Sequence, residues 1–237
     1  MRIACLTVLA TLAALSLPLV PPCGAQTTTA ASKPAALYQP AAGTDHARVR
    51  VDTGVHRGPG QANLPLVSVV APDHIGTTIS DQPQLYWYLS DDTKLPVEVS
   101  LYEVGTEDKL YEFSTAGSAA GFHCLDLAKE NVRLDLNKQY QFTVNVVVNP
   151  KDHASDRTTS GYIKRIKPPA ALPAGKDSFA ALLGSGIWYD GVADLMKQLE
   201  AKKGDADLTA ARDSLLRQVG LQEIAGKPLT GAVHTYP

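Results

Sequence analysis

The strongest constraint on the fold is the segment 140–146, in which apolar and polar side chains alternate strictly. This pattern is typical of a β-strand with one buried face. Shorter runs of extended character lie at 66–70, 85–89, 97–102, 109–114, 121–127 and 159–167, with turn residues between them. Prolines at positions 65, 72, 83, 96 and 150 exclude long helices from the same stretch. Residues 64–167 therefore predict an antiparallel β-sandwich of the immunoglobulin-like or fibronectin-like type.

Two aromatic residues are expected in the core of this sandwich. Trp87 shares one face of its strand with Leu85 and Leu89. Tyr140 follows a turn and opens the most regular strand. Its ring can enter the core while its hydroxyl bonds the backbone upstream, as in the tyrosine corner of such sandwiches. We expect Trp87 and Tyr140 to be structural core residues.

The pattern becomes helical after the prolines of residues 168–176, a segment that we interpret as a hinge. Residues 177–229 place apolar side chains at spacings of three and four, at Trp188, Val192, Leu195 and Leu199 and again at Leu208, Ala211, Leu215 and Val219. This spacing predicts a segment of two or three short α-helices. Residues 230–237 are expected to form a C-terminal tail.

The N-terminal segment has the features of an export signal. Residues 1–25 contain Arg2, a short apolar run and small residues before Gln26. Lipid attachment at Cys23 is an alternative, although the proline before it fits that alternative poorly. Removal of the signal leaves Cys124 as the only cysteine, so no intrachain disulfide is expected. No later segment approaches the ~20 apolar residues of a membrane-spanning helix. We expect an exported protein, periplasmic or secreted, without a transmembrane span.

Residues 26–63 are rich in Ala, Thr, Pro and Gly, and Tyr38 is their only aromatic residue. Such a composition buries too little apolar surface to offset the entropy lost on ordering the chain. We interpret this segment as a flexible tail that precedes the sandwich.

The sequence carries no common catalytic or cofactor motif. The formal net charge of −2 gives no basic excess for nucleic acid. Ser185 lacks the outer glycines of a nucleophile elbow, and neither a phosphate-binding loop nor paired metal-ligand motifs occur. Asp-His pairs at 45–46, 73–74 and 152–153 are interpreted as loop residues, which would bind a metal only if folding joined two of them. We expect no cofactor and no metal.

Two aromatic groups are candidates for binding a partner. Trp188, Tyr189 and Asp190 begin a predicted helix, where they either pack against neighbouring elements or form an aromatic contact for a partner or glycan. Tyr86 and Tyr88 point away from the Trp87 face, so they are either a covered second face or an exposed pair usable for binding.

Several phrases resemble a known family in order and spacing. They are His-Arg-Gly-Pro-Gly at 56–60, Pro-Gln-Leu-Tyr-Trp-Tyr at 83–88, Leu-Asn-Lys-Gln-Tyr at 136–140, Gly-Tyr-Ile-Lys-Arg-Ile at 161–166, Gly-Ile-Trp-Tyr-Asp at 186–190 and Val-Gly-Leu-Gln-Glu-Ile-Ala at 219–225. Over about 56–229 the chain resembles the bacterial domain-of-unknown-function family 928, best known from exported cyanobacterial proteins. It departs from that family's pattern at Val148-Asn149, where Cys-Asp is common, and at Gly191, where Ala is common. The resemblance implies an exported protein and no particular activity.

Together these features favour a non-enzymatic binding module of the cell envelope, with a protein or a polysaccharide as its partner. The alternative is a hydrolase whose acid site is assembled from loops of the sandwich. Acids such as Asp91, Asp92, Glu98 and Glu103 could pair there for general acid–base catalysis. Two carboxylates or two Asp-His loops that meet in one cleft would favour the alternative.

Overall fold

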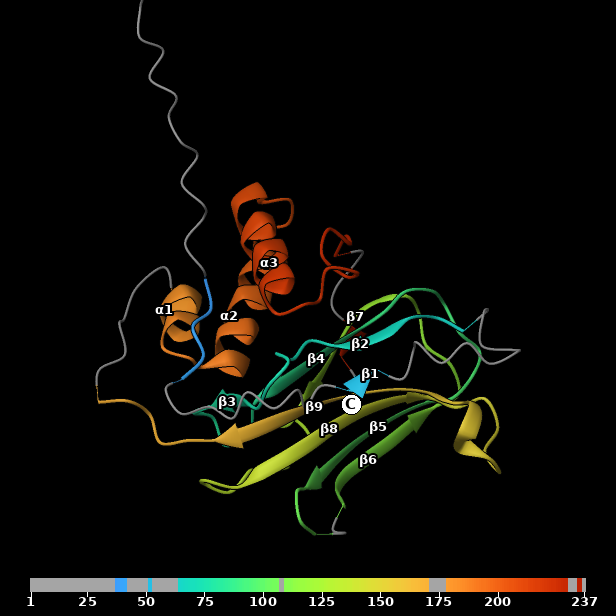
Figure 1. The fold of residues 1–237 in the computed structure, drawn as a ribbon. Helices are drawn as coiled ribbons and strands as arrows, with labels where there is room; N and C mark the ends of the chain where they lie inside the picture. The colour runs from blue at the N-terminus through green and yellow to red at the C-terminus, as the bar shows by residue number, and fades with distance from the viewer. Residues whose placement is uncertain are drawn as a thin grey trace, which may run out of the picture. The chain divides into compact units, whose positions relative to one another are not determined.

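The fold consists of two β-sheets and three C-terminal α-helices (Figure 1). A computed structural model describes residues 37–41, 51–52, 64–106, 109–170, 178–229 and 234–235. The prediction of a mainly β chain with a helical C-terminal segment is confirmed. The immunoglobulin-like type of the sandwich stays a prediction.

The larger sheet has six strands in the order β1-β9-β8-β5-β6, with β3 beside another part of β9. These strands are β1 (Val51–Asp52), β3 (Gly76–Thr78), β5 (Val97–Glu103), β6 (Lys109–Thr115), β8 (Gln139–Val146) and β9 (Arg157–Arg165). All their pairings are antiparallel except that of β3 with β9. The alternating segment at 140–146 is therefore the middle of this sheet.

The smaller sheet has four strands in the order β10-β7-β4-β2. They are β2 (Val67–Val69), β4 (Gln84–Leu89), β7 (Gly121–Asp126) and β10 (His234–Thr235). Strand β10 runs parallel to β7, and β2 and β7 are antiparallel to β4. Strands β1 and β10 lie in the segments expected to be tails, so both segments contribute backbone pairing to the sheets.

The core lies between the two sheets and contains both predicted aromatic residues. Trp87 of β4 is fully buried, and its ring centroid lies 6.1 Å from that of Phe142 on β8 of the opposite sheet. Tyr140 is also buried, and its hydroxyl accepts a hydrogen bond from the backbone N–H of Asp135 at 2.8 Å. This contact is the local tyrosine device that the sequence predicted.

The helices are α1 (Ser178–Gly184), α2 (Trp188–Ala201) and α3 (Ala206–Gln218). Gly186, at a φ of 80°, turns the chain between α1 and α2, where a Cβ would meet the backbone of Ala41. Asp205 caps α3 by accepting hydrogen bonds from the backbone N–H groups of Asp207 and Leu208. α2 begins after Ile187 without a side-chain cap hydrogen bond. The prediction of two or three helices agrees with the three that are present.

The helical segment packs on the smaller sheet, because α2 contacts β4 as well as β3. Tyr86 and Tyr88 on the outer face of β4 are only 5% and 6% exposed. The guanidinium of Arg212 on α3 lies 5.6 Å from the ring centroid of Phe122 on β7. Ser68 on β2 donates a hydrogen bond to Glu223, which follows α3. The second face of the smaller sheet is therefore covered by the helices and the chain that follows them.

Residues 37–41, which we call the N-terminal strap, pack against the helices. Tyr38 is 3% exposed, and its ring meets that of Trp188 edge-on at 4.8 Å. Its backbone N–H donates to the side chain of Gln218, and the N–H of Gln39 donates to Leu183 O. These five residues of the segment that we interpret as a flexible tail therefore pack against the helices, with Tyr38 as the buried side chain.

Candidate functional site

The predicted Trp188–Tyr189 contact lies inside the molecule. Trp188 is fully buried, and its indole N–H donates to Val70 O at 3.1 Å. The Tyr189 hydroxyl donates to Tyr162 O at 3.0 Å, and burial raises the pKa of Tyr189. Both side chains fasten the start of α2 to the sheets. They therefore act as packing residues, and so does the covered pair Tyr86 and Tyr88.

Asp190, the third residue of the predicted group, joins α2 to the end of β3. Its Oδ2 accepts hydrogen bonds from Thr78 Oγ1 at 2.7 Å and from Ile79 N–H at 3.1 Å. Burial raises the pKa of Asp190, and these hydrogen bonds oppose that effect. The carboxyl group holds the β3–β4 connection against the first turn of the helix.

Asp190 also lines a cleft of about 230 Å³, which we call the Asp190 cleft. Its other lining residues are Ser80, Gln82, Pro83, Gln84, Ala193, Asp194 and Lys197. Asp190 and Asp194 are four residues apart on α2, so their Cβ atoms are roughly 5–6 Å apart. The cleft thus contains the two carboxylates that the hydrolase alternative requires. Sequence reasoning missed Asp194, although its helical spacing from Asp190 was a usable signal.

The other acids considered for hydrolysis have local roles. Asp92 accepts a hydrogen bond from the backbone N–H of Ala120 at 2.8 Å, and Asp91 accepts one from Ser90 Oγ at 2.6 Å. Glu103 forms an ion pair with Lys138 at 2.9 Å. These contacts stabilise turns and strand ends and leave the Asp190 cleft as the candidate acid site.

A second cleft, of about 280 Å³, lies where the end of α2, α3 and the chain near residue 228 meet. Arg212, one of its lining residues, forms an ion pair with Asp213 at 2.6 Å. Its charge is therefore balanced within the protein, which weakens the attraction of this cleft for an anion.

A polar surface lies on the larger sheet, on the side opposite the core. The strand registers of β5, β6, β8 and β9 bring their outward residues into one surface, the polar face, composed of Glu98, Ser100, Tyr102, Lys109, Glu112, Ser114, Gln139, Gln141, Thr143, Asn145, Thr158, Ser160, Tyr162 and Lys164. Side chains at both ends of β6 are exposed, and Gln141, Thr143 and Asn145 are partly exposed. The alternation in the sequence identifies the polar residues of β8, but only the strand register shows which residues of the neighbouring strands lie beside them.

A family model, described as Domain of Unknown Function (DUF928), matches residues 52–229. The chain belongs to the DUF928 family. The match covers both sheets except β1's first residue and β10, and it covers all three helices. It confirms the resemblance drawn from the sequence phrases. A comparison with curated proteins finds no match.

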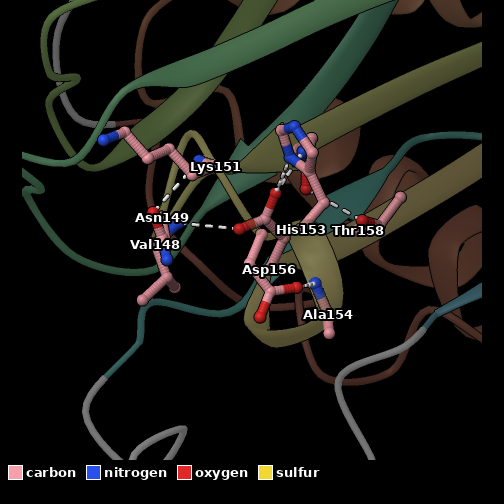
Figure 2. A network of polar contacts seen from close by, with 9 residues as sticks. Val148, Asn149, Lys151, His153, Ala154, Asp156 and Thr158 are labelled. Carbon is pink, nitrogen blue, oxygen red and sulfur yellow. Dashed lines mark hydrogen bonds and ion pairs between the residues drawn. The ribbon is translucent and has the colours of Figure 1, made fainter.

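Val148 and Asn149 of this DUF928 chain lie in a polar network between β8 and β9 (Figure 2). Asp156 is buried, and its carboxylate accepts hydrogen bonds from Val148 N–H at 2.8 Å and from Asn145 Nδ2 at 2.9 Å. His153 Nδ1 lies 2.7 Å from the same carboxylate. Asn149 Oδ1 accepts from Lys151 N–H at 3.0 Å. Positions 148 and 149 therefore help to shape this connection.

The Asp-His pairs give no metal centre in the part of this DUF928 chain that the structure describes, which contains no group of three or more His, Cys, Asp or Glu suited to a metal ion. His74 Nδ1 lies 3.0 Å from Asp73, and its Nε2 lies 2.9 Å from the Tyr38 hydroxyl. His153 pairs with Asp156 rather than with its neighbour Asp152. The pair at 45–46 lies outside the described residues.

Cys124 is a free, buried thiol on β7, and burial raises its pKa to about 12. It therefore stays protonated at neutral pH and behaves as a small apolar residue. Among the described helices, none has the length and apolar content needed to cross a membrane.

Proposed function

We propose that this DUF928 protein is an exported, non-catalytic binding module of the bacterial cell envelope, periplasmic or secreted, that holds a protein or polysaccharide partner on its polar face. The observation that carries the proposal is the difference between the outward faces of the two sheets. The smaller sheet presents Tyr86, Tyr88 and Phe122, which are all buried. The larger sheet presents polar residues that reach solvent.

The polar face is not needed to close the core of the protein, so it is free to bind a partner. The core is closed by the inner faces of the two sheets, and the helices close the second face of the smaller sheet. Partly exposed amide and hydroxyl groups on adjacent strands provide donors and acceptors at fixed spacings. A rigid sheet holds such groups more accurately than a loop does.

The test is retention of envelope components by the mature protein and by a variant of the polar face. Thr143→Arg places a long cation in the middle of this face, whereas Lys202→Glu changes an exposed residue after α2. We expect the wild type and Lys202→Glu to retain the same protein or glycan and Thr143→Arg to lose it. Equal retention by both variants would refute the polar face as the binding surface.

The second candidate function is hydrolysis, and it is favoured by the two carboxylates of the Asp190 cleft. Against it, the cleft is smaller than the ~300–1,000 Å³ of most ligand pockets. Asp194 Oδ2 also accepts a hydrogen bond from Gln198 at 3.1 Å. Release of reducing sugars or peptides from envelope material, abolished by Asp194→Asn, would support hydrolysis. Unchanged release in that variant would exclude Asp194 from the chemistry.

A further inference from the structure

We infer that Tyr102, Gln141 and Tyr162 form a binding row for an uncharged polysaccharide chain that lies across the strands of the polar face. The inference rests on the proposed function and adds the class of ligand and the residues that contact it. Each residue comes from a different strand: Tyr102 from β5, Gln141 from β8 and Tyr162 from β9.

The strand register places the three side chains in line. Tyr102 pairs with Gln141, and Gln141 pairs with Tyr162. Directly paired residues on adjacent strands point to the same side of a sheet. With neighbouring strands ~4.8 Å apart, the two tyrosines are separated by about 10 Å, with the glutamine between them. That separation is comparable to the length of a disaccharide unit.

The chemistry of the row suits a sugar. A tyrosine ring offers a flat apolar surface for the C–H face of a pyranose, and its hydroxyl remains able to hydrogen-bond. The Gln141 amide carries two donors and an acceptor. Within the described residues this amide makes no side-chain hydrogen bond, so it is available to a ligand. Both tyrosines and Gln141 are partly exposed.

The adjacent row continues the same surface with hydroxyl groups. Ser100 pairs with Thr143, and Thr143 pairs with Ser160. Ser100 and Ser160 are buried because they are short and lie low between larger neighbours, whereas Thr143 is partly exposed. A chain that crosses the tyrosine row would therefore meet a second line of donors and acceptors beside it.

The charge of the polar face favours an uncharged ligand. Lys109 forms an ion pair with Glu112, and its Nζ lies 5.5 Å from the ring centroid of Tyr102. Glu98 and Lys164 are the other charged residues of the face, so the charges of Lys109, Glu112, Glu98 and Lys164 sum to 0. Such a surface has no excess charge of either sign with which to attract a charged polymer.

A polysaccharide also fits the face better than a protein does. The centre of a protein interface is usually apolar, and it gains most of its energy from buried aromatic and aliphatic anchors. None of the residues of β5, β6, β8 and β9 that form the face is Leu, Ile, Val, Met or Phe, and its two tyrosines are two strands apart. A protein partner is the competing outcome of the experiment that follows.

The experiment is affinity electrophoresis of the mature protein in native gels that contain hydroxyethyl cellulose, laminarin or dextran, with alginate as a charged comparison. We expect retardation by at least one uncharged polymer and none by alginate. Tyr102→Ala and Tyr162→Ala should each weaken binding by about fivefold or more, since each removes one stacking surface. Tyr102→Phe and Tyr162→Phe keep the rings and should bind within about twofold of the wild type. Circular dichroism and thermal melting show whether each variant is folded.

Three results would overturn the inference, and they differ in what they imply for the proposed function. Polysaccharide binding that both Tyr→Ala variants retain would move the site away from this row and leave a binding module in place. Absence of polysaccharide binding, combined with a protein partner lost in Thr143→Arg, would leave the polar face as a protein-binding surface. Absence of both would refute the inference and the proposed function together.

Discussion

At the scale of single residues, Gly161 on β9 gives the most direct test of core packing. A Cβ at this position would lie 2.5 Å from the Cβ of Ala71, closer than atoms can approach. We expect Gly161→Ala to lower the free energy of unfolding by about 1–3 kcal/mol through overpacking. Gly184→Ala is the matched control, because a Cβ there meets nothing within 4 Å and adds helix propensity at the end of α1. Urea unfolding distinguishes the two, and equal stabilities would contradict the close packing.

The pair His153–Asp156 predicts a pH dependence of stability. Burial raises the pKa of Asp156, but the hydrogen bonds from His153, Val148 and Asn145 outweigh it and hold that pKa below its ordinary 3.8. The same contact raises the pKa of His153 above its ordinary 6.5. The contribution of Asp156 to the stability of the fold is thus complete above pH 3.8, and it is lost as the pH falls through the lower pKa that Asp156 has in the folded state. The contribution of His153 to the stability of the fold is complete below pH 6.5, and it is lost as the pH rises through the higher pKa that His153 has in the folded state.

We therefore expect the contribution of this pair to stability to be greatest between pH 3.8 and pH 6.5. Unfolding free energies measured from about pH 2 to about pH 9 would show it as a difference between the wild type and Asp156→Asn. Asp152→Asn serves as the control, since Asp152 accepts the backbone N–H of Ala154 at the start of the same turn and is the smallest of the causes that raise the pKa of His153. A constant difference between wild type and Asp156→Asn at every pH would contradict the assigned pKa shifts.

The residues show where sequence reasoning succeeds. Trp87 and Tyr140 could be placed in the core because period-two alternation decides which side of a strand a residue faces. The same alternation correctly set Tyr86 and Tyr88 on the other face, but it carries no information about what covers that face. Asp194 was missed for a similar reason, since its role depends on the β3–β4 connection, which is more than 100 residues away in the sequence.

At the scale of secondary-structure elements, Asp190 is expected to fix α2 against the end of β3. Asp190→Ala removes the acceptor of the Thr78 and Ile79 hydrogen bonds and should lower stability by roughly 1.5–3 kcal/mol. Asp194→Ala, one turn further along the helix, removes the contact with Gln198, which is neither buried nor shared with another element, and should cost less than about 1 kcal/mol. Thermal or urea unfolding of the two variants measures the difference. A larger loss in Asp194→Ala would contradict the anchoring role of Asp190.

The elements that sequence reasoning missed share one physical property. Strands β1 and β10 have two residues each and β3 has three, and they are held by pairing with β9 and β7 rather than by a local pattern. An alternation of period two can be recognised only over about four residues or more. Long elements such as β8 and α2 were predictable because their own periodicity matches the surface they bury.

At the scale of the whole molecule, the strap ties the N-terminal part of the described chain to the helices. Tyr38 contacts Trp188 through its ring and His74 through its hydroxyl. The side chain of Gln218 on α3 accepts a hydrogen bond from the backbone N–H of Tyr38 and donates one to the backbone carbonyl of Tyr38. The strap therefore bridges α2, α3 and the chain before β3. We infer that its loss loosens the helical segment as a unit, rather than exposing a single side chain.

Tyr38→Ala tests this bridging directly in the full-length chain. Removal of a buried aromatic side chain costs about 3–5 kcal/mol, because a cavity remains where the ring was. Tyr38→Phe keeps the ring against Trp188 and removes only the hydroxyl contact with His74, so it should cost about 0.5–1.5 kcal/mol. Hydrogen exchange should then show faster exchange in α1 and α2 of Tyr38→Ala, while β8 and β9 keep their protection. Equal exchange in the helices of both variants would mean that the strap rests on the helical segment without stabilising it.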